Sequence, residues 1–516
     1  MQLLRCISQR LRDEIPLTFF VGVMSFLTIV LFNIPFFRFV LDNVDYKSLN
    51  GLIIVIGLVI MMLIANAFVY YLIFYISNIV GRILLSIFFV ANSIAIYFIN
   101  TYNIILDESM IGNVLNTNYS EASSFFSFSI VLYVLLIGVL PSIYVFKAKI
   151  IKETWRRFIK RSFIALVFIL VMIFANASNW LWIDKYSQQL GGLVMPWSYS
   201  VNIPLHYIHK YQSNRQEILL PDATVKDNEK AIVVLVIGES ARSMNFSLYG
   251  YHKNTNPMLS KTENIFHFPA TSCATYTTAG VKCILEHQNT NELYEILPNY
   301  LYRNNIYVVW RSVNWGEPPI RVAKYQNYDY LSNLCHDDDF LGYDEMLLKG
   351  LREEITSSDK NKIFIVLHTS TSHGPSYNKK YPPKFEIFKP VCSSVELSKC
   401  TSEELINAYD NTIVYTDYIL HRIIEELKAL PEYHSTMIFV SDHGESLGEK
   451  NLYMHGVPMS FAPKEQYEIP FIVWVSEGYK TLKPLDNLSQ GHVFHSILNF
   501  LSVESPVYNE ELNVFK

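Results

Sequence analysis

The stretch Ala231-Ile232-Val233-Val234-Leu235-Val236-Ile237 contains no polar residue and runs directly into Gly238-Glu239-Ser240. An apolar run of this length, rich in β-branched residues, is typical of a strand buried on both faces of a parallel sheet. Four similar runs follow along the chain, at Ile306–Trp310, Ile363–Leu367, Thr436–Val440 and Phe471–Val475. Helical patterns alternate with them at Asn291–Arg303, Tyr343–Glu353, Ser402–Leu430 and His492–Phe500. The sequence therefore predicts an α/β domain whose sheet is largely parallel and covered by helices on both faces.

Potential metal ligands follow three of these strands. They lie in Gly238-Glu239-Ser240, in Ser372-His373-Gly374-Pro375 and in Ser441-Asp442-His443-Gly444-Glu445. Ligands in such sheets gather beyond the carboxyl ends of the strands, so the fold would bring these segments together. Carboxylate oxygens with one imidazole nitrogen suit Zn²⁺, with Mn²⁺ as the alternative. We therefore predict a divalent-metal site built from Glu239, Asp442 and His443.

A metal ion beside a hydroxyl lowers its pKa and produces a nucleophile. The residues alone do not select that hydroxyl: Ser240, Thr275, Thr277 and Thr278 are all candidates, and Ser240 could instead cap a helix. His373 and His455 each precede a glycine in a predicted loop. Three roles remain open for each of these histidines: second-metal ligand, general acid or phosphate partner.

Composition divides the chain into an apolar and a polar part. Half of the residues are hydrophobic and only 17% are charged, whereas a soluble domain has about 25% charged residues. The apolar excess lies in residues 1–182. Five segments there reach the roughly 20 apolar residues that span a bilayer: Pro16–Phe37, Gly51–Tyr75, Ile79–Ile99, Phe126–Phe146 and Ser162–Trp182. The net charge of −5, without a basic stripe, excludes nucleic acid as a partner.

Basic residues orient the predicted spans. Lys and Arg are frequent before the first span (Arg5, Arg10 and Arg12) and in Lys147–Arg161, but absent from residues 100–125. Because cytoplasmic loops carry excess Lys and Arg, the N-terminus is expected inside and the polar part outside the cytoplasm. We predict a transmembrane domain over residues 1–182, a connector with interfacial helices over 183–230 and a catalytic domain over 231–516. Within the connector, Val201–Tyr211 could be an amphipathic helix on the membrane or could equally pack on the soluble domain.

Six cysteines are present, five of them in the polar part. Cys273 and Cys283 form one close pair in the sequence, and Cys392 and Cys400 form another. Short-range disulfides suit an oxidising compartment, and neither pair has the CxxC spacing of a thiolate zinc site. We predict two disulfides and expect Cys335 to remain a thiol.

A further pattern lies in the outer loop between the third and fourth predicted spans. Asn113, Thr117 and Glu121 recur every four residues and would share one face of a helix. A carboxylate beside amide and hydroxyl groups could hold an ammonium headgroup at the membrane surface. From spacing alone, a solvated face is the simpler interpretation.

Several motifs in the same order resemble the phosphoethanolamine transferases of Gram-negative bacteria. That family includes lipid A transferases and the mobile colistin-resistance enzymes, within the alkaline phosphatase superfamily. The resemblance covers nearly the whole chain. It is carried by Gly238-Glu239-Ser240, Thr271-Ser272-Cys273-Ala274-Thr275-Tyr276-Thr277, Ser372-His373-Gly374-Pro375, Ala408-Tyr409-Asp410-Asn411, Ser441-Asp442-His443-Gly444-Glu445-Ser446 and His455-Gly456. The segment Trp310–Glu317 departs from it, because it lacks the cysteine-bearing loop of some relatives.

The resemblance implies an alkaline-phosphatase or sulfatase-like fold and a role for each matching residue. Thr277 falls on the nucleophile. The implied zinc ligands, for one or two ions, are Glu239, Thr277, Asp442 and His443. His373 and His455 fall on histidines that bind the transferred phosphate or a second zinc, and Asn113, Thr117 and Glu121 fall on residues that bind the donor headgroup.

The implied reaction takes phosphoethanolamine from phosphatidylethanolamine to a lipopolysaccharide acceptor, with lipid A phosphate as the first choice. It passes through a phospho-threonine and releases diacylglycerol. The protein is expected as a monomer in the bacterial inner membrane, with its catalytic domain in the periplasm. The added ammonium group would weaken the binding of cationic peptides such as polymyxins.

Two rival functions are a different membrane enzyme of the same superfamily (phosphodiesterase, sulfatase or glycerol-phosphate transferase) and a non-catalytic scaffold. The paired cysteines and the Asn113/Thr117/Glu121 pattern argue against a glycerol-phosphate transferase. A scaffold would bind no metal, whereas every proposed ligand position here holds a competent residue.

Overall fold

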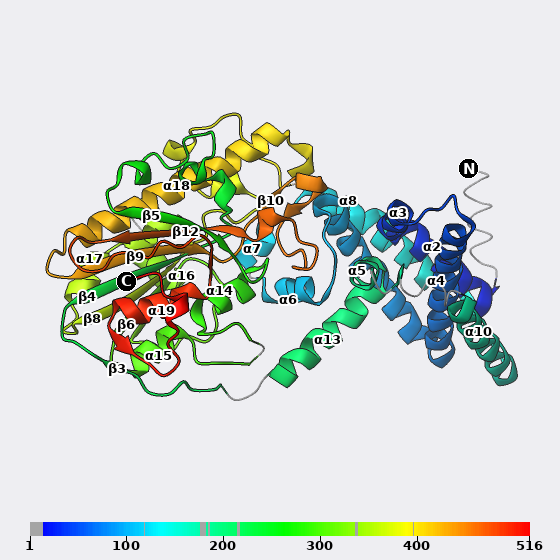
Figure 1. Cartoon of the computed structure of the whole chain (residues 1–516). Helices are drawn as coiled ribbons and strands as arrows, with labels where there is room; N and C mark the ends of the chain where they lie inside the picture. The colour runs from blue at the N-terminus through cyan, green and yellow to red at the C-terminus, as the bar shows by residue number, and fades with distance from the viewer. Residues whose placement is uncertain are drawn as a thin grey trace. The chain divides into compact units, whose positions relative to one another are not determined.

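A computed structural model describes residues 14–117, 119–175, 182–183, 186–213, 217–290, 292–335, 339–395 and 397–516 (Figure 1). The chain forms two compact units. One unit contains the described residues up to Ile111 together with Phe126–Tyr207, and the other contains Gly112–Phe125 together with Ile208–Lys516. The first is apolar and helical, and the second contains the sheet. Arg5, Arg10 and Arg12 lie outside the described residues.

The helical unit has fewer candidate spans than the five predicted. Among the described residues, three helical segments are long and apolar enough to cross a membrane: α4 (Leu49–Ile76), α5 (Asn78–Tyr102) and Phe128–Lys147. The last is built from α8 (Phe128–Tyr133), a π-helical segment (Val134–Val139) and α9 (Leu140–Lys147). A fourth is obtained if a bent helix pair is taken as one span.

That bent pair replaces the first predicted span, Pro16–Phe37. Helices α2 (Leu17–Phe32) and α3 (Ile34–Asn43) meet at an angle of 66°. Pro35 stands in the first turn of α3 and lacks the N–H that would continue the α2 hydrogen-bond ladder. Asn33, at the break, directs its side chain to the backbone of Met195. Hydropathy alone predicted an unbroken span, because it does not distinguish Pro35 from the apolar residues around it.

The fifth predicted span, Ser162–Trp182, is not confirmed. Helix α10 runs from Trp155 to Ala175 and includes four basic residues in its first two turns (Arg156, Arg157, Lys160 and Arg161). Residues 176–181, where the predicted span continues, lie outside the described part of the chain. The described helix therefore has too short an apolar stretch to qualify by length and composition.

Three asparagines from the helical unit hold one later segment. Asn33 accepts from the Met195 N–H at 2.9 Å and donates to the Met195 carbonyl at 3.0 Å. Asn66 of α4 accepts from Trp197 Nε1 at 2.7 Å, and Asn92 of α5 accepts from the Tyr199 hydroxyl at 2.9 Å. All three asparagines are buried. Met195, Trp197 and Tyr199 therefore each bind a different part of the bundle. The last two lie at the start of helix α13 (Trp197–Ser213). Helix α13 contains the predicted interfacial helix Val201–Tyr211.

The second unit is built on an eight-stranded sheet with the order β13-β5-β12-β9-β4-β8-β6-β7. All five predicted strands are present: β4 (Ala231–Gly238), β6 (Tyr307–Ser312), β8 (Lys362–His368), β9 (His434–Ser441) and β12 (Glu468–Val475). β5 (Ile265–Thr271), β7 (Lys324–Gln326) and β13 (Leu488–Ser489) complete it. Strand β4 lies between β8 and β9 and is parallel to both. Every residue of β4 is buried, as its apolar sequence predicted.

The sheet is mixed rather than wholly parallel. β12 runs antiparallel to both β5 and β9. Helix α18 (Ser402–Lys428) covers one face of the sheet, while α14 (Thr277–Leu285), α15 (Leu297–Arg303) and α19 (His492–Phe500) cover the other (Figure 1). Alternate residues of β4, namely Val233, Leu235 and Ile237, share one core with α14, α15 and α19.

Two predicted helices are shorter or interrupted. In Tyr343–Glu353, a 3₁₀ turn (Asp344–Leu348) is separated from α17 (Leu351–Thr356) by Gly350, whose φ is +63°. α15 begins at Leu297 rather than at residue 291, with Pro298 in its first turn. Helix α18 begins as predicted, because Thr401 and Glu404 form a capping box.

Candidate metal and nucleophile site

The topology brings the predicted ligands together. Because β4 and β9 are neighbouring parallel strands, Gly238 pairs with Ser441, and the residues that follow, Glu239 and Asp442, emerge at the same edge. Helix α14 starts at Thr277 and places its first turn beside them. The Thr277 hydroxyl lies 3.4 Å from Glu239 Oε2 and 3.3 Å from His443 Nε2. Among the candidate hydroxyls, those of Thr277 and Ser240 both lie within hydrogen-bond range of Glu239, and that of Thr277 also contacts His443 Nε2.

The donor atoms of Glu239, Asp442 and His443 all lie within 4.8 Å of one another. His443 Nε2 is 3.6 Å from Glu239 Oε1 and 3.3 Å from Asp442 Oδ2. The opposite ring nitrogen, Nδ1, lies 2.8 Å from the Gly444 carbonyl. Nδ1 then carries the proton and donates, so that Nε2 presents a lone pair toward the cluster.

Burial and mutual interaction perturb all three groups. Burial would raise the pKa of Glu239, but the imidazoles of His373, His443 and His455 lower it below its ordinary value. Burial and the charge of Glu239 raise the pKa of Asp442 well above its ordinary value. Burial and the neighbouring His455 lower the pKa of His443 to about 3, so the imidazole is neutral.

These three residues fit a divalent cation. Two carboxylates buried side by side repel each other, and a cation between them would remove that repulsion. Asp442 Oδ2 is buried and has no hydrogen-bond donor among the described residues. Oxygen donors with one neutral imidazole are ligands that Zn²⁺ accepts, and the Thr277 hydroxyl would add a fourth ligand.

His373 and His455 stand at the same site. Their ring centroids are 5.6 Å apart, and the His455 ring lies 4.3 Å from that of His443. His373 Nδ1 lies 2.6 Å from the Gly374 carbonyl. The structure therefore brings both predicted histidines to the cluster.

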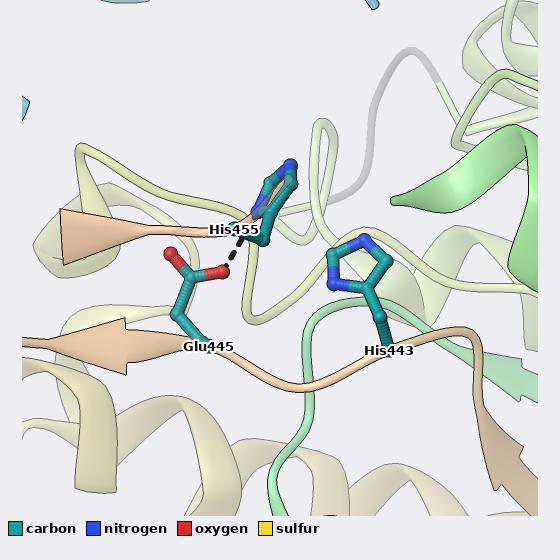
Figure 2. Close-up of side chains that lie close together, drawn as sticks. All are labelled: His443, Glu445 and His455. Atoms are coloured by element: carbon teal, nitrogen blue, oxygen red, sulfur yellow. Dashed lines mark hydrogen bonds and ion pairs between the residues drawn. The ribbon is translucent and has the colours of Figure 1, made fainter. Parts of the chain in front are cut away.

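Glu445 is a site residue that the sequence prediction did not include. Its carboxylate Oε2 lies 2.9 Å from His455 Nδ1, and its Oε1 accepts from the Tyr377 hydroxyl at 2.7 Å. Figure 2 shows Glu445 and His455 joined by this contact, with His443 on the same loop as Glu445. His443, Glu445 and His455 form a second possible ligand group. Both groups include His443.

Asn314 is a second residue that sequence reasoning missed. Its Nδ2 donates to Glu239 Oε2 at 2.7 Å and to the Thr369 carbonyl at 2.8 Å. It lies in Trp310–Glu317, the segment in which the chain departs from the family pattern. Its position directly after β6, at the same sheet edge as Glu239, was the signal that could have identified it.

The outer-loop residues do not lie on a single helix. α6 (Glu108–Asn116) contains Asn113 and α7 (Tyr119–Ser124) contains Glu121, with Thr117 between the two helices. The Thr117 hydroxyl donates to the Asn113 carbonyl at 2.8 Å, so these two residues are in contact. The segment Gly112–Phe125 belongs to the same compact unit as the sheet.

Both predicted disulfides are present. Cys273–Cys283 links the loop before Thr277 to the last turn of α14, and Cys392–Cys400 closes a loop before α18. Cys335 is buried and takes part in neither. The first disulfide encloses the predicted nucleophile and therefore restricts the motion of its helix.

Comparison with known proteins relates both units of the chain to phosphoethanolamine transferases. A sulfatase family model matches residues 231–503, and a model for phosphoethanolamine transferase EptA/EptB matches residues 61–211. Phosphoethanolamine transferase EptA of Helicobacter pylori is 40% identical and covers 94% of each chain. Phosphatidylethanolamine transferase Mcr-1 of Escherichia coli is 30% identical over 90% of this chain and 91% of its own.

Two solved structures are similar as well. The integral membrane lipooligosaccharide phosphoethanolamine transferase A (EptA) of Neisseria meningitidis has a TM-score of 0.87 at 24% identity, covering 96% of this chain and 97% of its own. The C-terminal periplasmic domain of phosphoethanolamine transferase EptC from Campylobacter jejuni has a TM-score of 0.51 at 36% identity. It covers 58% of this chain and 97% of its own. The first match extends the similarity in fold over both units.

Proposed function

The chain belongs to the phosphoethanolamine transferase family, and on that basis we propose that it transfers phosphoethanolamine from phosphatidylethanolamine to lipopolysaccharide, with a lipid A phosphate as the first acceptor to test. The observation that carries the proposal is the position of Thr277, whose hydroxyl lies 3.4 Å from Glu239 and 3.3 Å from His443. The names of the H. pylori and E. coli relatives support the transferred group and the donor.

The reaction proceeds in two displacements at phosphorus. In the first, Thr277 Oγ1 forms a bond to the phosphorus of the donor while the bond from phosphorus to the diacylglycerol oxygen breaks. Diacylglycerol leaves with a proton, and phosphoethanolamine remains on the threonine. In the second, an acceptor oxygen attacks the same phosphorus, and Thr277 Oγ1 leaves and regains its proton. Each bond broken is matched by one formed.

The surrounding side chains have defined tasks. Glu239, Thr277, Asp442 and His443 would hold a zinc ion. When bound, that ion would lower the pKa of the hydroxyl and offset charge on the phosphoryl oxygens. His373 and His455 bind the phosphoryl group, and one of them donates the proton that diacylglycerol takes away. Asn113, Thr117 and Glu121 bind the ethanolamine ammonium.

The proposed location is the bacterial inner membrane, with the sheet-containing unit in the periplasm. Two disulfides in that unit and the distribution of Lys and Arg support this side of the membrane. Both lipids lie in the same membrane as the helices, which raises their concentration near the site. We propose residues 1–182, 183–230 and 231–516 as membrane, connector and catalytic parts, and a monomer as the active form.

The nucleophile is tested by comparing Thr277→Ala with Thr278→Ala in the detergent-solubilised full chain. We expect T277A to abolish diacylglycerol release from labelled phosphatidylethanolamine, and T278A to retain it, because no described hydrogen bond joins Thr278 to the cluster. Mass spectrometry of a quenched reaction should find phosphoethanolamine on the peptide that contains Thr277. Unimpaired release by T277A would assign the nucleophile elsewhere.

The donor and the acceptor need separate tests. Labelled phosphatidylethanolamine should yield diacylglycerol, and labelled phosphatidylglycerol should not; the reverse result would indicate a glycerol-phosphate transferase. Mass spectrometry of lipid A and core oligosaccharide, from cells with and without the protein, should then show one added phosphoethanolamine unit. The fragment that carries it identifies the acceptor.

A further inference from the structure

Ser240 contacts three residues of the site at once. Its hydroxyl donates to Glu239 Oε1 at 2.7 Å and lies 3.5 Å from His455 Nδ1. Its backbone N–H donates to Asp442 Oδ1 at 3.0 Å. Ser240 therefore restricts the orientation of both carboxylates that would bind the metal, although it is not among the proposed ligands.

This arrangement needs an uncommon backbone conformation. Ser240 has a φ of +53°, in the left-handed region that residues with a β-carbon rarely adopt. Such a conformation persists only where neighbouring groups hold it in place. In the right-handed region, the Ser240 N–H and hydroxyl would point elsewhere, and both carboxylates would lose a donor.

Tyr409 holds the Ser240 turn in this conformation. This residue of α18 is fully buried. Its hydroxyl donates to the Ser240 carbonyl at 2.7 Å and accepts from the Arg242 N–H at 3.0 Å. One hydroxyl thereby joins the two ends of the turn that contains Ser240. The Tyr409 ring is fixed in turn by the edge of Tyr377, at 5.5 Å, and by the Arg242 guanidinium, at 5.5 Å.

We propose that Tyr409 is a positioning residue for the metal site: its hydroxyl holds the left-handed turn at Ser240, and that turn aims Glu239 and Asp442 at the cation. The proposal rests on the proposed function, since it assumes that these carboxylates bind zinc. Tyr409 is fully buried, so it acts only through the residues that it holds. Groups that orient metal ligands commonly change metal affinity by 10- to 100-fold when removed, on the order of magnitude seen across metalloproteins.

Tyr409→Phe tests the proposal, with Tyr415→Phe as its matched control. Tyr415 lies on the same helix and is equally buried, and its hydroxyl accepts from the Glu345 N–H at 3.1 Å, away from the turn. Both variants lose one buried tyrosine hydroxyl. Zinc is removed from the full-length protein in detergent, and zinc affinity is measured by competition with a fluorescent chelator.

We expect Y409F to raise the zinc Kd by about 10- to 100-fold, and Y415F to leave it unchanged. The KM for phosphatidylethanolamine should not change in either variant, and excess zinc should restore much of the kcat of Y409F. An unchanged zinc Kd in Y409F would overturn the proposal. An equal rise of the zinc Kd in both variants would also overturn it, because that result would indicate that either substitution destabilises α18 as a whole.

Ser240→Gly provides a second test if Y409F does not fold. Glycine adopts the left-handed conformation without strain and keeps the N–H, but it removes the hydroxyl that holds Glu239. We expect S240G to fold and to bind zinc more weakly, and unchanged affinity would exclude a role for that hydroxyl. Failure of the unaltered protein to transfer phosphoethanolamine would contradict the proposed function. Normal transfer together with unaltered zinc binding in Y409F would contradict only this inference.

Discussion

Gly280, in the helix that carries Thr277, packs directly against the backbone of Asp442. A β-carbon at Gly280 would lie 2.8 Å from the Asp442 carbonyl carbon and 3.1 Å from its Cα. Only a residue without a side chain allows α14 to approach the loop after β9 so closely. This contact sets the separation between Thr277, the proposed nucleophile, and Asp442, a proposed metal ligand, which lie far apart in the sequence.

Gly280→Ala should therefore lower transfer activity more than it lowers the stability of the fold. The added β-carbon would overlap the Asp442 backbone, so helix α14 or the loop after β9 would have to move, and misplacement of about 1 Å can cost about 100-fold in rate. We expect transfer to fall by roughly that factor. Gly191→Ala in α12 (Ser187–Leu193) is the control, because a β-carbon there meets no atom within 4 Å. Full activity in G280A would show that α14 can move without consequence.

Asn314→Asp should disable the site by adding a charge beside Glu239. The Asn314 amide donates to Glu239 at 2.7 Å, whereas an aspartate there would repel the carboxylate and accept nothing from it. Transfer measured with labelled donor should fall by about 10- to 100-fold. Asn305→Asp is the control, since its side chain faces Lys360 Nζ at the surface. Activity retained in N314D would show that Glu239 needs no donor at this position.

Glu286 predicts a dependence of stability on pH. Burial raises its pKa from 4.5 to about 7, although Lys282 lies 3.0 Å away and opposes the shift. The folded state thus favours the protonated acid, so ionisation costs stability as pH rises from about 4.5 to about 7, and the cost is constant above pH 7. Glu286→Gln should therefore raise the melting temperature more at pH 8 than at pH 5.

The comparison for this variant is Glu504→Gln. Glu504 is exposed and pairs with Lys226 at 3.3 Å, so its substitution should change the melting temperature little at any pH. Melting of the full chain in detergent at pH 5, 6, 7 and 8 measures both effects. A stabilisation by E286Q that is the same at every pH would contradict the assigned ionisation.

The two disulfides should differ in their effect on activity. Cys273–Cys283 and Cys392–Cys400 span 10 and 8 residues, so loop-closure entropy predicts similar stabilisation, about 2–3 kcal/mol each. Replacing both cysteines of a pair by serine should lower the melting temperature by similar amounts. Only the first replacement should also slow transfer, because only that loop contains Thr277. Equal rates in the two double variants would show that the first disulfide does not position the nucleophile.

The candidate metal ligands at the strand ends could be predicted from the sequence, because carboxylate and imidazole residues directly follow the apolar runs that predict buried strands. Glu239, Asp442 and His443 were identified in this way. Selecting Thr277 among four hydroxyls required the family resemblance, since all are short polar side chains near a predicted turn. Gly280 could not be recognised as a contact, because a glycine shows no partner in the sequence.

Other features depend on contacts between distant parts of the chain. The bend at Asn33 involves Met195, 162 residues later, so hydropathy alone predicts an unbroken span. Strand β5 was missed because His267 and Pro269 interrupt its apolar pattern and much of it is exposed. The bonds from Ser240 to Asp442 and from Asn314 to Glu239 join residues that are 202 and 75 positions apart in the sequence, and no local pattern marks them.

The hydrogen bonds of Asn33, Asn66 and Asn92 determine when, during synthesis, the helical bundle can be completed. Asn33, Asn66 and Asn92 leave the ribosome long before Met195, Trp197 and Tyr199, which later donate hydrogen bonds to their amide oxygens. In hydrocarbon such polar groups are costly until they are paired. The early helices therefore enter the bilayer as an unfinished bundle, and synthesis through Tyr199 completes it before the strands of the sheet emerge.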